Sequence, residues 1–261
     1  MNSSKSRNRW VSISLAVMLV LLLGFSLIPL VSSIFLGNQR VNQPVTSLES
    51  RWESEVLGYE LVLEREPDNQ TAWRGLLEVR LKQGNLPAAL VPLEKLAQLN
   101  PEQTDYQILL AQSQQQIQDN EGAITTYRNL LASHPENLLG LKGLVDLLVK
   151  EKRITEAIKL VQDTAQKALT NPNLSLDVMA LQLMLGEIYG QQQQYDQALA
   201  VYEQAIKADG QDFRPLLAKA LTLQKQGKPD AAQPLFKQAI TLAPVQYKDQ
   251  IQELALDSQE R

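Results

Sequence analysis

The chain has 261 residues, a formal net charge of −4 at pH 7, a single histidine and no cysteine. This inventory cannot assemble a Cys/His nucleophile pair or a His/Cys metal cluster, and no Gly-rich phosphate loop is present. We therefore expect no enzyme, no catalytic residue, no metal, no cofactor and no small-molecule substrate. The acidic balance also argues against nucleic acid as a partner, because nucleic-acid binding needs a clustered basic surface.

The N-terminal part of the chain predicts a membrane anchor. Residues 1–9 carry Lys5, Arg7 and Arg9, whereas residues 10–36 contain no charged side chain. At 1.5 Å per residue a helix over 10–36 would reach about 40 Å, which exceeds the roughly 30 Å of bilayer hydrocarbon. The sequence therefore predicts one transmembrane helix at 10–36, preceded by a short cytoplasmic segment at 1–9.

Flanking cations predict the orientation of this anchor. Three cations precede the apolar run, and only Arg40 and Arg51 follow it closely. The positive-inside rule then places the N-terminus in the cytoplasm of a plasma or thylakoid membrane, with the rest of the chain on the other side. A cleaved signal peptide is the alternative reading, although its apolar region is usually only 7–15 residues long.

A polar linker at 37–45 leads to a segment at 46–69 in which apolar residues recur at helical spacing. Thr46 and Glu49 have the spacing of a helix-starting capping box. Tyr59 lies eight residues before Pro67, a spacing between an aromatic residue and a proline that returns later in the chain.

Small residues and prolines recur every 34 residues through the rest of the chain. Pro67 is followed at this interval by Pro101 and Pro135. Alanines keep the same interval, except that the third and fourth are 41 residues apart, which indicates an insertion of about seven residues: Ala89, Ala123, Ala157, Ala198 and Ala232. A period of this length is typical of stacked helix-turn-helix units, which bury their apolar faces only by stacking on one another.

These positions resemble the tetratricopeptide repeat (TPR) family. The repeat at 179–212 carries most of the landmarks, namely Leu185, Gly186, Tyr189, Ala198, Tyr202 and Ala205. Two residues depart from the pattern: Thr164 occupies a position where the family has alanine, and Lys219 occupies a leucine position. The resemblance implies an all-α fold, a right-handed α-solenoid preceded by the transmembrane helix. Within 46–261 we expect a leading half-repeat, five repeats and a capping helix, at 46–69, 70–103, 104–137, 138–178, 179–212, 213–246 and 247–258.

The family resemblance also implies a concave groove that binds protein partners. In TPR proteins the first helices of successive repeats line this groove. Transferred to this chain, the candidate partner-binding residues are Arg74, Glu78, Lys82, Ile108, Gln112, Lys142, Asp146, Lys150, Leu183, Glu187, Arg214, Leu217 and Lys225. Neutral positions on the same face include Gln115, Gln116 and Gln191. We expect a mildly basic groove with apolar patches, in which Lys142 and Lys150 are exposed.

One subtype of groove is not expected. Chaperone-binding TPR domains hold a C-terminal carboxylate with a clamp of Lys, Asn and Arg, but the corresponding positions here are Arg74, Glu78, Leu109, Leu139 and Gly143. The sequence thus predicts a membrane-anchored adaptor that binds protein partners. It resembles in architecture the factors that assist assembly of photosynthetic membrane complexes. The alternatives are a factor of c-type cytochrome maturation, or a periplasmic or lumenal binding protein that is released when the N-terminal segment is cleaved.

Overall fold

The computed structural model describes residues 45–171 and 174–256, and these residues form twelve helices and no strand. The predicted all-α class is therefore confirmed for this part of the chain. The N-terminal segment at 1–9, the anchor at 10–36 and the linker up to residue 44 lie outside the described residues. None of the described helices is both long enough and apolar enough to cross a bilayer.

The chain divides into two compact units, with the boundary between Glu102 and Gln103. The sequence predicted a single continuous solenoid instead. Repeats in a solenoid contact only their neighbours, so such a chain can divide at any junction between repeats. Unit 1 contains the described helices α3 (Val45–Arg65), α4 (Gln70–Lys82) and α5 (Leu86–Leu99). Within it α4 packs against both α3 and α5.

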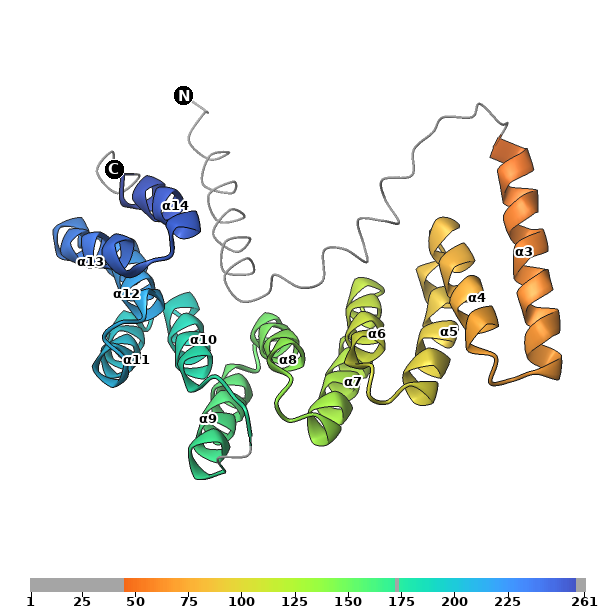
Figure 1. Ribbon diagram of the computed structural model, residues 1–261, viewed down its shortest axis with the longest axis horizontal. Helices are drawn as coiled ribbons and strands as arrows, with labels where there is room; N and C mark the ends of the chain where they lie inside the picture. The colour runs from red at the N-terminus through yellow and green to blue at the C-terminus, as the bar shows by residue number, and fades with distance from the viewer. Residues whose placement is uncertain (1–44, 172–173, 257–261) are drawn as a thin grey trace. The chain divides into compact units, whose positions relative to one another are not determined.

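Unit 2 is a row of helix pairs, in which every helix packs against the next one along the chain (Figure 1). The first helices also contact one another, α6 with α8 and α10 with α12. The helices are α6 (Thr104–Gln116), α7 (Asn120–Ser133), α8 (Leu138–Lys150), α9 (Ile154–Thr170), α10 (Val178–Gln191), α11 (Tyr195–Ala208), α12 (Phe213–Lys225), α13 (Pro229–Leu242) and α14 (Val245–Leu256).

Asparagine or aspartate is the N-cap residue of most of the helices that come first in their repeats. Each of these side chains accepts a hydrogen bond from a backbone N–H in the first turn of its helix, which satisfies one of the donors that a helix start leaves unpaired. They are Asn69 for α4, Asn137 for α8, Asp177 for α10 and Asp212 for α12. Prolines such as Pro101 and Pro135 lie just beyond the second helices, as expected for a residue that cannot continue a helix.

The turn inside every hairpin contains one residue in the left-handed backbone region. This residue is Gly84 in the first repeat and Gly227 in the last, with φ of 68° and 78°. In the three repeats between them the same position holds Gln118, Lys152 and Gln193, with φ of 68°, 62° and 59°. A residue with a Cβ atom is strained there, so three of the five turns store a small backbone cost.

Tyrosines on the second helices pack against glycines on neighbouring first helices. Tyr127 on α7 lies against Gly143 on α8, and Tyr59 on α3 lies against Gly75 on α4. Both pairs are 16 residues apart in the sequence. The contact of Tyr59 therefore has the sequence spacing of a repeat contact, which supports the prediction that α3 is the second helix of a leading half-repeat.

The repeating alanines lie where the helices approach most closely. All five have no exposed surface: Ala89, Ala123, Ala157, Ala198 and Ala232. In α3 the corresponding residue, 34 positions before Ala89, is Glu55, whose Oε1 accepts a hydrogen bond from Arg51 Nε at 2.8 Å. A carboxylate at this position leaves α3 with a polar surface where a further repeat would stack, as expected for the end of a solenoid.

At the other end α14 covers the last repeat with its buried residues Ile251 and Ala255. It begins two residues before the capping helix expected at 247–258, because Val245 follows Pro244 directly and a proline is well placed before a helix. The ring of Tyr247 stacks on Phe213 of α12, with ring centroids 5.7 Å apart. Residues 257–261 are not described.

Candidate protein-binding surface

The candidate groove residues of unit 1 form an exposed strip on α4. Lys82 Nζ lies 2.6 Å from Glu78 Oε1, one turn earlier on the helix. Arg74 donates a hydrogen bond from Nη2 to Gln70 Oε1 at 3.1 Å. Since these contacts are local to one exposed helix, the strip leaves its charged groups accessible to a partner.

Three apolar candidates are not on a surface at all. Ile108, Leu183 and Leu217 are 3%, 7% and 3% exposed. All three occupy the fifth position of their repeats, and the structure buries this position where the residue is apolar. The prediction that they provide apolar patches to a partner is therefore wrong, because almost no area remains to be covered.

Arg214 is bound to the starts of two first helices. Its guanidinium contacts Asp177 Oδ2 at 2.9 Å and Asp212 Oδ2 at 2.6 Å, and these two aspartates are the N-caps of α10 and α12. The hydrogen bond from Arg214 to Asp212 outweighs the cost of burial and raises the pKa of Arg214. Its charge is thus neutralised within the protein, and the excess of positive charge predicted for the groove is correspondingly reduced.

Four of the remaining charged candidates of unit 2 interact with one another and with Gln191, and we call these five residues the groove cluster: Lys142, Asp146, Glu187, Gln191 and Lys225. Lys142 on α8 lies between two carboxylates, with Nζ 3.2 Å from Asp146 Oδ2 and 4.0 Å from Glu187 Oε2 of α10. Only 15% of the Lys142 side chain is exposed. The expectation that Lys142 is an exposed cation is therefore wrong, since it links two repeats.

Glu187 is the most unusual member of the groove cluster. Burial disfavours its charged form, and nearby Asp146 repels it, so the pKa of Glu187 is raised above its ordinary value despite the attraction of Lys142 and Lys225. Gln191 donates a hydrogen bond from Nε2 to Glu187 Oε1 at 3.3 Å. A carboxyl in this environment can gain from a further hydrogen-bond donor supplied by a partner.

A layer of tyrosine hydroxyls lies beneath the cluster. The Tyr127 hydroxyl accepts a hydrogen bond from Gln115 Nε2 at 3.2 Å, and burial raises the pKa of Tyr127 to about 12. Burial likewise raises the pKa of Tyr202, which interacts with Glu187 and forms a hydrogen bond with Thr222. The sequence predicted only a packing role for these tyrosines. Their position in the repeat does not reveal that the hydroxyl reaches the groove side.

The accessible surface over this layer is rich in amides and carries charges of both signs. Its exposed residues are Gln112, Gln116, Asp146, Lys150, Gln191 and Lys225. A glutamine side chain both donates and accepts hydrogen bonds, so such a row can pair with the backbone of an extended segment as well as with polar side chains. Charges of both signs favour a partner with mixed polarity over a uniformly charged one.

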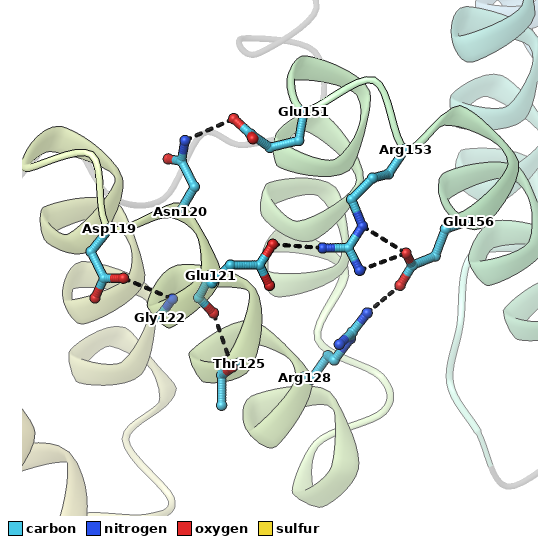
Figure 2. Close-up of polar contacts among 9 residues, drawn as sticks. All are labelled: Asp119, Asn120, Glu121, Gly122, Thr125, Arg128, Glu151, Arg153 and Glu156. Atoms are coloured by element: carbon cyan, nitrogen blue, oxygen red, sulfur yellow. Dashed lines mark hydrogen bonds and ion pairs between the residues drawn. The ribbon is translucent and has the colours of Figure 1, made fainter.

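A second charged group links the second helices α7 and α9 (Figure 2). Arg153 contacts Glu121 Oε1 at 2.9 Å and Glu156 Oε2 at 2.7 Å, and Glu156 also pairs with Arg128. Burial opposes the charge of Glu156, but its bonds to the two arginines outweigh burial and lower its pKa. Every charge in this network already has a partner, so we assign the network to joining two repeats.

Nothing in the described residues suggests a metal site. No three His, Asp or Glu side chains of this part of the chain converge on a point where a cation could bind. His134 closes the C-terminal end of α7, where its backbone N–H bonds to the carbonyl of Leu130, and its Nδ1 lies 3.7 Å from Glu136 Oε1. Its surroundings are those of a helix end rather than of a reactive group.

The sequence pattern described as tetratricopeptide repeat matches residues 66–244 of the chain. Protein SLOW GREEN 1, chloroplastic, of Arabidopsis thaliana is 25% identical over 216 residues, which cover 80% of this chain and 68% of that protein. Cellulose synthase operon protein C of Pseudomonas fluorescens (strain SBW25) is 33% identical over 113 residues, but these cover 42% of this chain and only 9% of that protein.

Among solved structures, yeast Tom70 is similar with a TM-score of 0.51 and 17% sequence identity. The match covers 78% of this chain and 42% of the Tom70 chain. At this identity the similarity shows a common fold of stacked helix pairs and nothing more.

Proposed function

This chain belongs to the tetratricopeptide repeat family, and we propose that it is a membrane-anchored scaffold that binds protein partners along the first helices of unit 2. The observation that carries the proposal is the groove cluster. Lys142, Asp146 and Glu187 bring charged groups from α8 and α10 together on one surface, and Gln191 and Lys225 add donors beside them. A polar surface of this kind, built on rigid helices, suits recognition of a segment of another protein.

The anchoring part of the proposal rests on the uncharged length of residues 10–36. If this helix is retained, the linker at 37–45 is short enough to keep the repeats within about 30 Å of the bilayer surface. A partner would then be held next to the membrane, which raises its effective concentration there. Such confinement is useful for a factor that assists assembly of membrane complexes.

We further propose that these complexes are photosynthetic ones. The support is the similarity over most of this chain to a chloroplast protein, together with the predicted anchor. A role in c-type cytochrome maturation remains the competing assignment. Identification of the bound partner distinguishes the two.

Site-specific photo-crosslinking in the native membrane tests the binding surface. A photoreactive residue at Gln191 reports on the groove cluster, and one at the exposed Lys159 of α9 reports on the second helices. We expect a defined partner to crosslink at 191 and not at 159. Crosslinking at 159 alone would place the binding surface on the second helices and contradict the proposal.

Charge reversal provides a quantitative version of the test. Lys150→Glu with Lys225→Glu changes two exposed cations of the groove, and we expect partner affinity to fall about tenfold or more with no loss of helicity. The matched control is Lys159→Glu with Lys167→Glu, two exposed cations on α9. Lys142→Glu is unsuitable, because it would place a third carboxylate beside Asp146 and Glu187 and disturb folding.

Retention of the anchor is tested separately by alkaline washing of membranes and by the mass of the mature N-terminus. We expect the full-length chain to remain in the membrane pellet. A soluble chain that starts after residue 33 would instead show that residues 10–36 form part of a cleaved signal peptide.

A further inference from the structure

The loop between α11 and α12 differs in its chemistry from the loops that follow the other second helices. The residue after the C-cap is proline behind four of these helices, α5, α7, α9 and α13, namely Pro101, Pro135, Pro172 and Pro244. Behind α11 the C-cap is Asp209, and the next residue is Gly210. A proline has no backbone N–H, whereas Gly210 has one.

The sequence Asp209–Gly210 can react with itself. The backbone nitrogen that follows an aspartate can attack the carboxyl carbon of its side chain, and glycine favours this attack because it has no Cβ to crowd the nitrogen. Of the 12 glycines in this chain, only Gly210 follows an aspartate or asparagine. At the C-caps Asn100 and Asn171 the same attack is blocked, because the next residue is proline and has no N–H to lose.

The folded loop leaves this backbone nitrogen free. Residues 209–211 are all exposed. The N–H of Asp209 donates to Ala205 O at 3.0 Å and that of Gln211 donates to Asp209 Oδ1 at 2.9 Å, but within the described residues the N–H of Gly210 has no acceptor.

Ring closure also requires a rotation of the backbone. The ψ angle of Asp209 is 97°, which places the Gly210 nitrogen and the Asp209 carboxyl carbon on opposite sides of the Cα–C bond. The loop must turn about this bond before the two atoms meet. Because the loop residues are exposed, packing does not oppose that rotation, and the reaction can proceed without unfolding of the repeats.

We propose that Asp209 is a site of spontaneous modification, at which aspartate converts to isoaspartate in the folded protein. In the first step the Gly210 nitrogen bonds to Asp209 Cγ and loses its proton to solvent, and the hydroxyl of the protonated carboxyl leaves as water. The product is a cyclic succinimide. In the second step water adds to one of the two ring carbonyls and opens the ring. One opening restores aspartate, and the other gives isoaspartate, so the net reaction is an isomerisation.

Isoaspartate changes the loop just before a contact that joins two repeats. The main chain becomes longer by one methylene group, and the carboxyl carbon of residue 209 becomes part of the backbone. Three residues later Asp212 caps α12 and binds Arg214, which also binds Asp177 at the start of α10. The altered backbone displaces the Asp212 carboxylate from Arg214, so the modification weakens the link between α10 and α12.

Ageing of the folded full-length chain in a mild detergent tests the proposal. Isoaspartate is detected by electron-transfer fragmentation of peptides, which distinguishes the two main-chain connections, and by an enzyme that methylates isoaspartyl carboxylates. We expect isoaspartate to accumulate at residue 209. The internal control is Asp68, which is exposed in the loop before α4. It should stay aspartate, because the N–H of the following Asn69 donates to Glu66 O at 3.0 Å.

Substitutions at the two loop residues test the chemistry. Gly210→Pro removes the attacking N–H, so isoaspartate should be absent. Gly210→Ala should slow its formation several-fold, and the new Cβ would lie 3.7 Å from Ile206 O, an ordinary contact that leaves the fold intact. Asp209→Asn should react faster, because an amide is a better leaving group than an ionised carboxylate. Circular dichroism melting checks that each variant is folded.

Three results would overturn the proposal: no excess of isoaspartate at residue 209 over residue 68, equal formation in Gly210→Pro, or formation only after unfolding in urea. The structural consequence has its own readout. Aged unmodified protein should melt at a lower temperature than fresh protein, and aged Gly210→Ala should change less over the same period. Complete conversion at residue 209 with no change in melting temperature would contradict the weakened link through Arg214.

Discussion

Tyr127 and Gly143 form a matched pair across the junction between α7 and α8. A Cβ atom on residue 143 would lie 2.5 Å from Tyr127 Cζ and 2.6 Å from its hydroxyl oxygen. Tyr127 is 1% exposed and its hydroxyl is bound to Gln115, so the ring has no room to move. A methyl group on residue 143 therefore forces the buried Tyr127 ring or the helix to shift.

The first prediction is that Gly143→Ala destabilises the protein. In an open helix this change would stabilise by about 1 kcal/mol, but here the overpacking against Tyr127 costs about 1–3 kcal/mol. The net effect should be a loss of up to about 2 kcal/mol, measured by urea unfolding.

The matched control is Gly190→Ala in α10, where nothing lies within 4 Å of the new Cβ. It should stabilise the fold by about 0.5–1 kcal/mol. In the Tyr127→Leu background, Gly143→Ala should lose most of its penalty. Equal penalties in both backgrounds would show that the tyrosine ring is not what excludes the methyl group.

The second prediction concerns the strained turns. Gln193 has φ of 59°, so Gln193→Gly should raise the free energy of unfolding by about 1 kcal/mol. The neighbouring residue Gln192 has φ of −86°, and there Gly should destabilise by about 0.5–1 kcal/mol because it only adds freedom to the unfolded chain. Thermal and urea unfolding of the two single variants decides the sign for each position.

The third prediction concerns pH and Glu187. Its folded pKa is raised, so the folded protein binds a proton more readily than the unfolded chain, and the stability contributed by Glu187 falls as pH rises from its ordinary pKa through the raised one. Glu187→Gln removes this loss. The melting temperature of the variant relative to the unmodified protein should therefore increase as pH rises from 4 to 7. A constant difference over this range would refute the assignment.

The fourth prediction concerns the ion-pair network of Figure 2. Arg153 is partly exposed to solvent, so its bonds to Glu121 and Glu156 are screened by salt. Arg153→Gln should lower the melting temperature slightly at low ionic strength and not at 1 M NaCl. The pKa of Glu156 is lowered, so its contribution is present above the ordinary carboxyl pKa and is lost as pH falls through the folded value. A loss that persists in high salt would point to packing instead of charge.

The fold could be predicted from the sequence because its helix contacts are local and recur periodically. The prolines and alanines that recur every 34 residues report helix ends and close helix contacts within one or two neighbouring elements, so no long-range information was needed. The same reasoning predicts that α3 is a half-repeat from the spacing of Tyr59 and Pro67, and the contact of Tyr59 with Gly75 in the structure has the spacing of Tyr127 and Gly143.

The candidate binding surface could be predicted from the sequence only in part. Position in the repeat correctly indicated which helices are first helices, but it could not say which side chains remain free. Lys142 is enclosed by two carboxylates, and Arg214 is bound by two helix caps, because residues far apart in the sequence meet only when repeats stack. Burial and charge pairing depend on such non-local neighbours, and a repeat pattern does not specify them.

The sequence by itself therefore determined the repeat period, the helix pairs and the absence of residues for Cys/His chemistry. Only the tertiary structure decided that Ile108, Leu183 and Leu217 belong to the core, that Glu187 is a partly buried carboxyl with a raised pKa, and that a left-handed residue lies in every hairpin turn. Periodicity records the average environment of a repeat position, whereas exposure, pKa and backbone strain depend on the particular neighbours at each junction.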